Sequence, residues 1–411
     1  MNLDFINSNT RQYTHGFHPY PAKMIPQVAN ALICEYGKNA SLLLDPYCGT
    51  GTTLVEASIR GLNSIGSDLN PLARLLSKVK TTPIEIQSLE LHLHDFYEYL
   101  FQFRYGFKTK DNIVIKSFPR IDFWFSKEVK EKLSIISNYI NQIENNDIRD
   151  FFNVAFSQTI RECSYTRNDE FKLYKMSSEK LKAFKPDPYC IMELVLGNNC
   201  IGLKEFILDR KDTRSTAIIS DFNSINAIPS KIIKDNSIDI VVTSPPYGDS
   251  STTVAYGQFS ALSNQWLGLM ENGRSLDKEL MGGNSHVEIK EFQSEILNQN
   301  IESIRKIDEK RAMEVSSFYS DYEKSIKNVS NAVKPNGFAC FVVSNRNVKG
   351  QILQTDIITQ DFFQQFNFRH IDTFYRKISN KRMPRYNSST GKKGEKTELM
   401  NTESIIVMKK K

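Results

Sequence analysis

The sequence lacks paired cysteines and histidines at metal-ligand spacing. It has 6 cysteines and 6 histidines, but no two cysteines form a C-x-x-C pair, and no histidine lies at zinc-ligand spacing from a cysteine. We therefore expect no metal centre and no disulfide framework. A reduced protein with free thiols, in the cytoplasm, is the simplest interpretation.

Long apolar segments are missing as well. The first 16 residues are polar and lack the apolar core of a signal peptide. No apolar run approaches the roughly 20 residues that a membrane-spanning helix requires. We expect no contact with a membrane.

Internal repeats and low-complexity tracts are absent too. The 411 residues, 40% hydrophobic and 24% charged, have the composition of a soluble globular protein with one large domain plus an insertion or second domain. The net charge of +6 agrees with a polyanionic partner, but many enzymes without one share it.

Two stretches of the chain show the strand–turn–helix rhythm of an α/β domain, namely residues 1–80 and 213–411. Short apolar runs, several of which end at an aspartate, are typical of buried parallel strands. The expected strands are residues 41–44, 63–67, 217–220, 238–243, 338–343 and 404–408. Residues 81–212 instead contain long amphipathic stretches with few turn signals, which predicts a mostly helical insertion.

Residues 42–57, LLLDPYCGTGTTLVEA, combine a strand, a glycine turn and a helix start. Gly49 and Gly51 leave no Cβ where the backbone approaches a ligand, and the helix start offers free N–H groups. Asp68 ends the next strand, where a carboxylate can accept hydrogen bonds from both ribose hydroxyls. The turn is not GxGxxG, which disfavours a dinucleotide. Taken alone, it also fits a tight connection in any α/β fold.

A second informative turn is Ser244-Pro245-Pro246-Tyr247, directly after the apolar run at 238–243. This places it at the carboxyl edge of the sheet, where open α/β folds bind ligands. Two consecutive prolines fix φ and hold one hydroxyl and one aromatic ring in set positions. Taken alone, the motif could also be a surface turn with a packed tyrosine.

Together the two turns resemble those of the DNA amino-methyltransferases, the site-specific modification methylases. In that family a D-P-F-x-G-x-G-T turn binds the methionine part of S-adenosyl-L-methionine (AdoMet), and Tyr47 here replaces the usual phenylalanine. The resemblance implies a Rossmann-like AdoMet-dependent methyltransferase fold, with a mixed sheet flanked by helices. Residues 1–80 and 213–411 would form its catalytic domain. The implied cofactor-binding residues are Lys23, Asp45, Tyr47, Gly49, Gly51, Thr52, Asp68 and Asp221.

Two of these residues have an equally plain alternative. Lys23 ends the segment FHPYPAK, which looks like the family's N-terminal motif, and it could pair with the cofactor carboxylate or be a solvated lysine. Asp221 matches the family's position near the adenine amino group, but it could also be a helix N-cap. The resemblance covers residues 17–80 and 215–350 well and is weaker after residue 370.

The resemblance also implies the chemistry. An exocyclic amino group is a poor nucleophile because its lone pair is delocalised into the ring. Hydrogen bonds to Ser244 Oγ and the Pro245 carbonyl would localise that lone pair for in-line attack on the methyl group. Tyr247 would stack on the flipped base, which offsets part of the few kcal/mol that flipping costs.

The first residue of the S-P-P-Y motif, Ser244, indicates which base is methylated. In the family S-P-P-Y goes mainly with cytosine N4, and D- or N-P-P-Y mainly with adenine N6, guanine N2 or protein glutamine. The absence of a Pro-Cys pair argues against cytosine C5 chemistry. We predict an N4-cytosine enzyme. N6-adenine is the main alternative, and an RNA or protein-glutamine methyltransferase or a silent nucleic-acid binder is more remote.

The expected partner is double-stranded DNA, which implies association with the nucleoid. Basic and aromatic residues interleave at 161–167 and 171–174 of the insertion, a candidate target-recognition region, although an ordinary amphipathic helix gives the same pattern. Residues 376–396 hold eight Lys or Arg and one acidic residue, which favours phosphate contact or a solvated loop. A cognate restriction endonuclease that acts separately is expected from the resemblance alone.

Overall fold

A seven-stranded sheet in the order β3-β2-β1-β4-β5-β11-β8 forms the centre of the computed structural model. The structure describes residues 1–411 except 2, 169, 250–252, 285–287, 379–385, 388–396 and 399–401. Neighbours from β3 to β5 pair in parallel, and β11 is antiparallel to both β5 and β8. The strands are β1 (Leu42–Asp45), β2 (Asn63–Ser67), β3 (Ala217–Ser220), β4 (Ile238–Thr243), β5 (Val333–Val343), β8 (Phe368–Lys377) and β11 (Thr402–Lys410).

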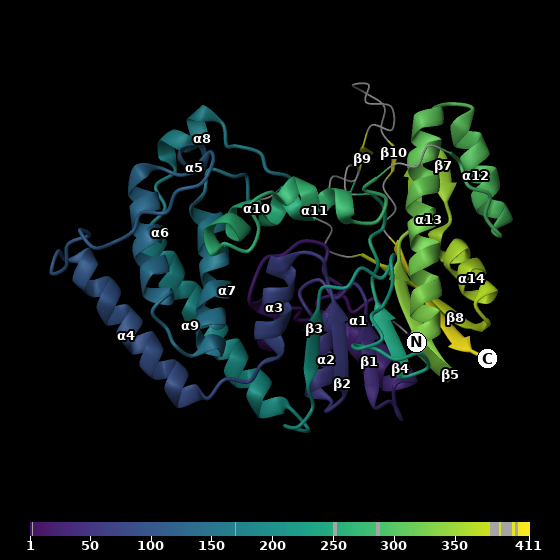
Figure 1. The fold of residues 1–411 in the computed structure, drawn as a ribbon, viewed down its shortest axis with the longest axis horizontal. Helices are drawn as coiled ribbons and strands as arrows, with labels where there is room; N and C mark the ends of the chain where they lie inside the picture. Colours follow the sequence, from purple (N-terminus) through teal and green to yellow (C-terminus); the bar gives the residue numbers. More distant parts are fainter. Residues whose placement is uncertain are drawn as a thin grey trace.

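Helices cover both faces of the sheet (Figure 1), because its central strands β1, β4, β5 and β11 carry buried apolar runs. Leu43 packs in one core with α1 (Pro26–Tyr36) and α2 (Thr52–Ile59), whereas its neighbour Leu44 packs in a second core with α12, α13 and α14. The bounds of the latter are Glu295–Arg305, Glu309–Ala332 and Thr355–Gln365. This three-layer arrangement is the predicted Rossmann-like fold.

Residues 86–209 form a helical body beside the sheet (Figure 1). In the described part its only β feature is an isolated bridge between Thr166 and Lys175. Its helices are α4 (Ile86–Arg104), α5 (Ile121–Trp124), α6 (Lys127–Ile140), α7 (Asn146–Cys163), α8 (Ser178–Ala183) and α9 (Pro188–Asp209). None of the described helices is long and apolar enough to cross a bilayer.

The helical body shares one hydrophobic core with three helices of the sheet domain, namely α2, through Val55 and Ile59, α3 (Pro71–Thr81) and α10 (Tyr256–Leu267). Trp266 of α10 is 2% exposed. Its ring meets Phe118, Phe125 and Phe156 edge-on, with centroids 5.7 to 5.9 Å apart. A single indole therefore anchors α10 to three separate segments of the helical body.

The smaller elements lie around this frame. They are η1 (Tyr13–Gly16), α11 (Gly273–Glu279), β6 (Arg346–Val348), β7 (Gln351–Leu353), β9 (Tyr386–Asn387) and β10 (Thr397–Glu398). Helix α11 follows α10 above the carboxyl end of the parallel strands (Figure 1), so this edge of the sheet is covered from above.

We expect Trp266→Ala to lower the free energy of unfolding by about 3–5 kcal/mol, because it removes a fully buried aromatic side chain. Urea denaturation followed by circular dichroism measures this change. The matched control is Leu208→Ala, whose side chain is 81% exposed and whose loss should cost less than about 0.5 kcal/mol. Equal, small losses in both variants would contradict the anchoring role of Trp266.

Candidate active site

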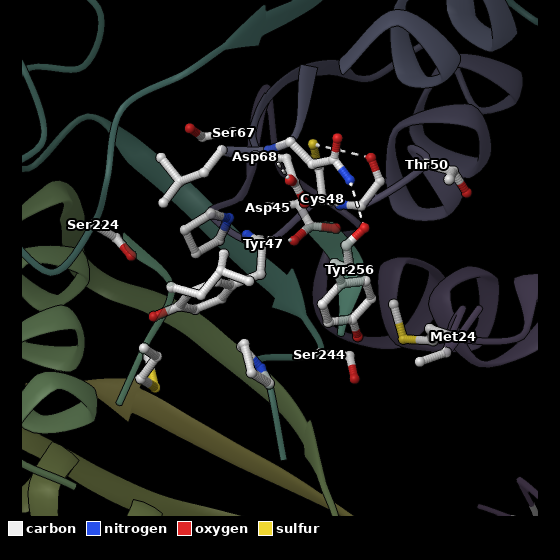
Figure 2. A pocket seen from close by; sticks show the side chains of 18 of the residues that line it. Met24, Asp45, Tyr47, Cys48, Thr50, Ser67, Asp68, Ser224, Ser244 and Tyr256 are labelled. Carbon is white, nitrogen blue, oxygen red and sulfur yellow. Dashed lines mark hydrogen bonds between the residues drawn. The ribbon is translucent and has the colours of Figure 1, made fainter. Parts of the chain in front are cut away.

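A pocket opens at the carboxyl ends of the parallel strands (Figure 2). Segments that are far apart in the sequence line it. They are residues 20–24, 45–50 with 52 and 53, 67–70, 222–225, Ser244, Pro246, Tyr256, Leu280 and Met281. Both sequence motifs therefore contribute to one pocket, with Gly49 and Ser244 in the same lining.

A buried hydrogen bond joins the two motif turns. Asp45 ends β1 and is 3% exposed, and its Oδ1 accepts from Thr243 Oγ1 of β4 at 2.6 Å. The same oxygen accepts from the Tyr47 backbone N–H at 3.2 Å. Desolvation by burial raises the pKa of Asp45 to about 6. The carboxylate fixes the glycine turn against the strand that carries Ser244.

The lack of a side chain at Gly49 and at Gly51 matters for different structural reasons. Gly49 has φ +50°, and a Cβ there would meet no atom within 4 Å, so its backbone faces open space in the pocket. Gly51 has φ +78° and lies outside the lining. A Cβ on Gly51 would lie 3.0 Å from Ser77 Cα, so this glycine allows α2 and α3 to pack closely.

Asp68 follows β2 and presents a half-buried carboxylate to the pocket (Figure 2). Its Oδ2 accepts from the Gly49 N–H at 3.1 Å and its Oδ1 from the Asn70 N–H at 2.7 Å. Each oxygen keeps a further lone pair for a ligand hydroxyl. Burial raises the pKa of Asp68 to about 6.

One lysine lines the pocket, and a second, buried lysine contacts a lining residue. Lys23 lines the pocket and donates to the carbonyls of His15 at 3.3 Å and His18 at 3.0 Å. Lys80 is fully buried, and its Nζ donates to Thr50 Oγ1 at 3.1 Å. Burial, together with the nearby Lys23 charge, holds the pKa of Lys80 well below its usual range. Sequence reasoning missed Lys80, which looks like any polar position on an amphipathic helix.

The proline turn divides between the pocket and the interior. Ser244 and Pro246 line the pocket, whereas the buried Pro245 and the half-buried Tyr247 lie outside its lining. Ser244 Oγ lies 3.1 Å from the Tyr247 hydroxyl, which lies 3.0 Å from Glu403 Oε1. Burial raises the pKa of Tyr247 well above its ordinary value, so this phenol stays protonated.

Besides Gly51, a second predicted cofactor residue, Asp221, lies outside the pocket lining. Asp221 follows β3 but is exposed, and the lining is provided by residues 222–225. Phe222 is 7% exposed and contributes an apolar side chain to the pocket wall, and Asn223 contributes a side-chain amide. Of the remaining predicted residues, Tyr47 and Thr52 do line the pocket.

The insertion segment singled out as a possible DNA-contacting face is partly interior. Arg161 is 5% exposed, donates to the Phe259 carbonyl at 3.2 Å and lies 3.8 Å from the centroid of that ring. Desolvation lowers the pKa of Arg161 to about 10. The expectation of phosphate contact is therefore wrong for Arg161, although Arg167 and Tyr174 nearby are exposed.

Most of the basic stretch at 376–396 lies outside the described residues. Arg376 is described and is 5% exposed, where it pairs with Glu403. Among the residues with a described position, no three His, Cys, Asp or Glu side chains are grouped to hold a metal ion.

Comparison with known proteins assigns the family. Residues 2–78 match the family model described as DNA methylase. The chain is 41% identical to the type II methyltransferase M.MvaI of Kocuria varians, over 99% of this chain and 93% of that protein. It is 21% identical to M.BsoBI of Geobacillus stearothermophilus, over 89% and 81%.

A solved structure is also similar. It is a putative DNA modification methylase from Thermus thermophilus in complex with S-adenosyl-L-methionine, with a TM-score of 0.23 and 14% identity over 45% of this chain and 51% of that one.

The 41% identity to M.MvaI extends over nearly the full length of both chains and, together with the family match, shows the family to which the protein belongs. The methyl donor of this class is AdoMet and its substrate is DNA. The chain is a DNA methyltransferase of the N4-cytosine or N6-adenine type, and it belongs to the DNA amino-methyltransferase family of type II restriction-modification systems.

Proposed function

We propose that this enzyme transfers the methyl group of AdoMet to N4 of cytosine in duplex DNA, after the target base flips into the pocket. The observation that carries the proposal is that Gly49, of the glycine turn, and Ser244, of the proline turn, line one pocket. Methyl donor and amino group can then meet directly, because both motifs face the same space. Direct in-line transfer needs no covalent enzyme intermediate.

We assign the cofactor-binding roles according to which predicted residues line the pocket. The two free lone pairs of Asp68 suit the ribose hydroxyls, and the open backbone at Gly49 suits close approach of the methionine part. Tyr47 and Thr52 complete this wall, and Lys23, which also lines the pocket, is assigned to the cofactor carboxylate. Asp45 and Gly51 act on the shape of the turn.

We assign the binding of the adenine end of AdoMet to Asn223 and Phe222. Both line the pocket, whereas Asp221 is exposed outside it. An amide oxygen can accept from the adenine amino group as a carboxylate can, and the Phe222 ring supplies an apolar surface for the base.

For the target amino group we assign the activating acceptors to Ser244 Oγ and the Pro245 carbonyl. Two hydrogen bonds from the amino group pull its nitrogen towards tetrahedral geometry and localise the lone pair. Pro246 keeps the turn stiff, and the ring of Tyr247 provides the stacking surface for the flipped base. The neutral serine favours N4 of cytosine, by resemblance to the S-P-P-Y members of the family.

The helical body is the candidate region for target recognition. The basic residues of the stretch 376–396 are the candidate for phosphate contact, except Arg376, which is buried and paired with Glu403. Exposed Arg167 and Tyr174 leave a basic and aromatic surface on the helical body, although Arg161 is interior. A restriction endonuclease of the same specificity, acting separately, is the partner that a modification enzyme of this type implies.

We expect 4-methylcytosine as the product. Purified enzyme is incubated with labelled AdoMet and unmethylated amplified DNA, and the nucleosides are then identified by mass spectrometry. Tyr247→Ala and Pro246→Ala should each abolish transfer, because they remove the stacking ring and the rigid turn, while AdoMet binding measured by calorimetry persists. A product of N6-methyladenine would refute the base assignment.

AdoMet affinity should fall as the pH drops through about 6. The pKa of Asp68 is about 6 in the free protein, and only the ionised carboxylate accepts from both ribose hydroxyls. Protonation therefore opposes binding below that pH, and the full affinity is reached above it. Calorimetry between about pH 5.5 and 7.5 measures the slope.

Asp68→Asn should weaken AdoMet binding about 10- to 100-fold at neutral pH, since hydrogen bonds to a charged group contribute roughly 1.5–3 kcal/mol. It should also reduce the pH slope, with the remainder due to Asp45, whose pKa is likewise about 6. Asp122→Asn, at a side chain that is 78% exposed, is the matched control and should change neither quantity. An unchanged affinity in Asp68→Asn would refute the ribose assignment.

A further inference from the structure

A row of hydrogen bonds leads from the pocket into the antiparallel end of the sheet. Ser244 Oγ lies 3.1 Å from the Tyr247 hydroxyl, and that hydroxyl lies 3.0 Å from Glu403 Oε1. Glu403 Oε2 pairs with Arg376 Nη1, and Arg376 Nε donates to the Leu3 carbonyl at 3.1 Å. Glu403 belongs to β11 and Arg376 to its neighbour β8, 159 and 132 positions after Ser244 in the sequence.

The donors and acceptors in this row can be arranged in one direction only. A guanidinium carries donors alone, and an ionised carboxylate carries acceptors alone. Arg376 therefore donates to Glu403, and Glu403 can only accept from Tyr247. Because the single phenolic hydrogen of Tyr247 is committed to Glu403, its oxygen must accept the hydrogen of Ser244.

This order decides what Ser244 offers to the pocket. Its only hydrogen points away, towards Tyr247, and its lone pairs remain for a ligand. An amino group needs an acceptor at this point. A hydroxyl free to rotate would spend part of its time with its hydrogen towards the ligand, where it opposes the N–H of the base.

We propose that Glu403, held by Arg376 and acting through Tyr247, is a positioning residue that keeps Ser244 in the role of hydrogen-bond acceptor for the amino group of the target base. The inference rests on the proposed function, since it requires an amino group as the methyl acceptor. It assigns a role to the antiparallel strands β8 and β11, which lie outside both sequence motifs.

The decisive variant is Glu403→Gln, which keeps the shape and replaces one acceptor oxygen by a donor. Arg376 donates to the amide oxygen, so the NH₂ group of the glutamine side chain faces Tyr247 and donates to its oxygen. Tyr247 must then donate to Ser244, and the direction of every hydrogen bond from the glutamine to Ser244 is reversed. Ser244 then presents its hydrogen to the pocket. We expect kcat for methyl transfer to amplified, unmethylated DNA to fall about 10- to 100-fold, the range of one lost or opposed hydrogen bond. The Kd for AdoMet should stay within about twofold.

Tyr247→Phe completes a double-mutant cycle. Removal of the phenolic oxygen cuts the row, so Glu403 can no longer influence Ser244. In this background Glu403→Gln should lower kcat by less than about twofold, although it costs about 10- to 100-fold alone. If Glu403 only stabilised the sheet, it would cost the same factor in both backgrounds, and that additive result would overturn the proposal.

Two controls keep the outcome unambiguous. Ser404→Ala removes a neighbouring hydrogen bond on β11, to Asp356 Oδ2 at 3.2 Å, and should leave kcat unchanged. If Glu403→Gln does not fold, Tyr247→Phe alone still tests the row: it frees the Ser244 hydroxyl to rotate and should lower kcat about 3- to 10-fold. A kcat equal to that of the wild type would overturn the proposal.

The failure of this proposal and that of the proposed function can be told apart. Nucleoside analysis of the wild-type product reports the base, whereas the cycle reports coupling between Glu403 and Tyr247 on total methyl transfer. N6-methyladenine with a non-additive cycle refutes the cytosine assignment alone. 4-Methylcytosine with an additive cycle refutes the role of Glu403 alone.

Discussion

The hydrogen bond between Thr243 Oγ1 and Asp45 Oδ1, 2.6 Å long, holds together the two halves of the active site. It is possible because β1 and β4 are adjacent parallel strands, with Leu44 opposite Val241, so their carboxyl ends reach the same edge of the sheet. The glycine turn and the proline turn leave these strands side by side. Every function assigned to the pocket depends on this adjacency, since neither turn alone can bring a methyl donor to an amino group.

Much of this arrangement could be predicted from the sequence. The parallel strands are apolar on both faces and end at polar residues, so Asp45, Asp68 and Thr243 marked the edge at which ligands bind. The α/β class followed from that strand pattern, and the helical character of the insertion followed from its long amphipathic stretches. The convergence of the two motifs was expected from the resemblance to the amino-methyltransferases. The roles of individual side chains in binding and transfer remain predictions.

Other features left no signal in the sequence. Strand β8 is largely exposed and lacks an apolar alternation, so it was not among the expected strands. Its last two residues, Arg376 and Lys377, were counted in the basic stretch instead. The contact of Glu403 with Tyr247 spans 156 positions, which no local pattern can encode. Asp221 matched a motif position, yet its exposure depends on how the chain leaves β3, a matter of loop geometry. The burial of Lys80 could not be predicted either, because its position fits the pattern of an ordinary amphipathic helix.

The shared core of the helical body has a consequence for how sequence specificity can change. Trp266 and the apolar face of α3 belong to the same cluster as Phe151 and Leu203 of the insertion. A recognition region joined by a linker could be exchanged between enzymes as a cassette, but the helical body, proposed above for this role, could not. Transplanting it would require α3 and α10 to travel with it, and both helices also border the pocket through Asn70 and Tyr256. Altered recognition is thus easier to reach by substitutions on its outer surface than by recombination.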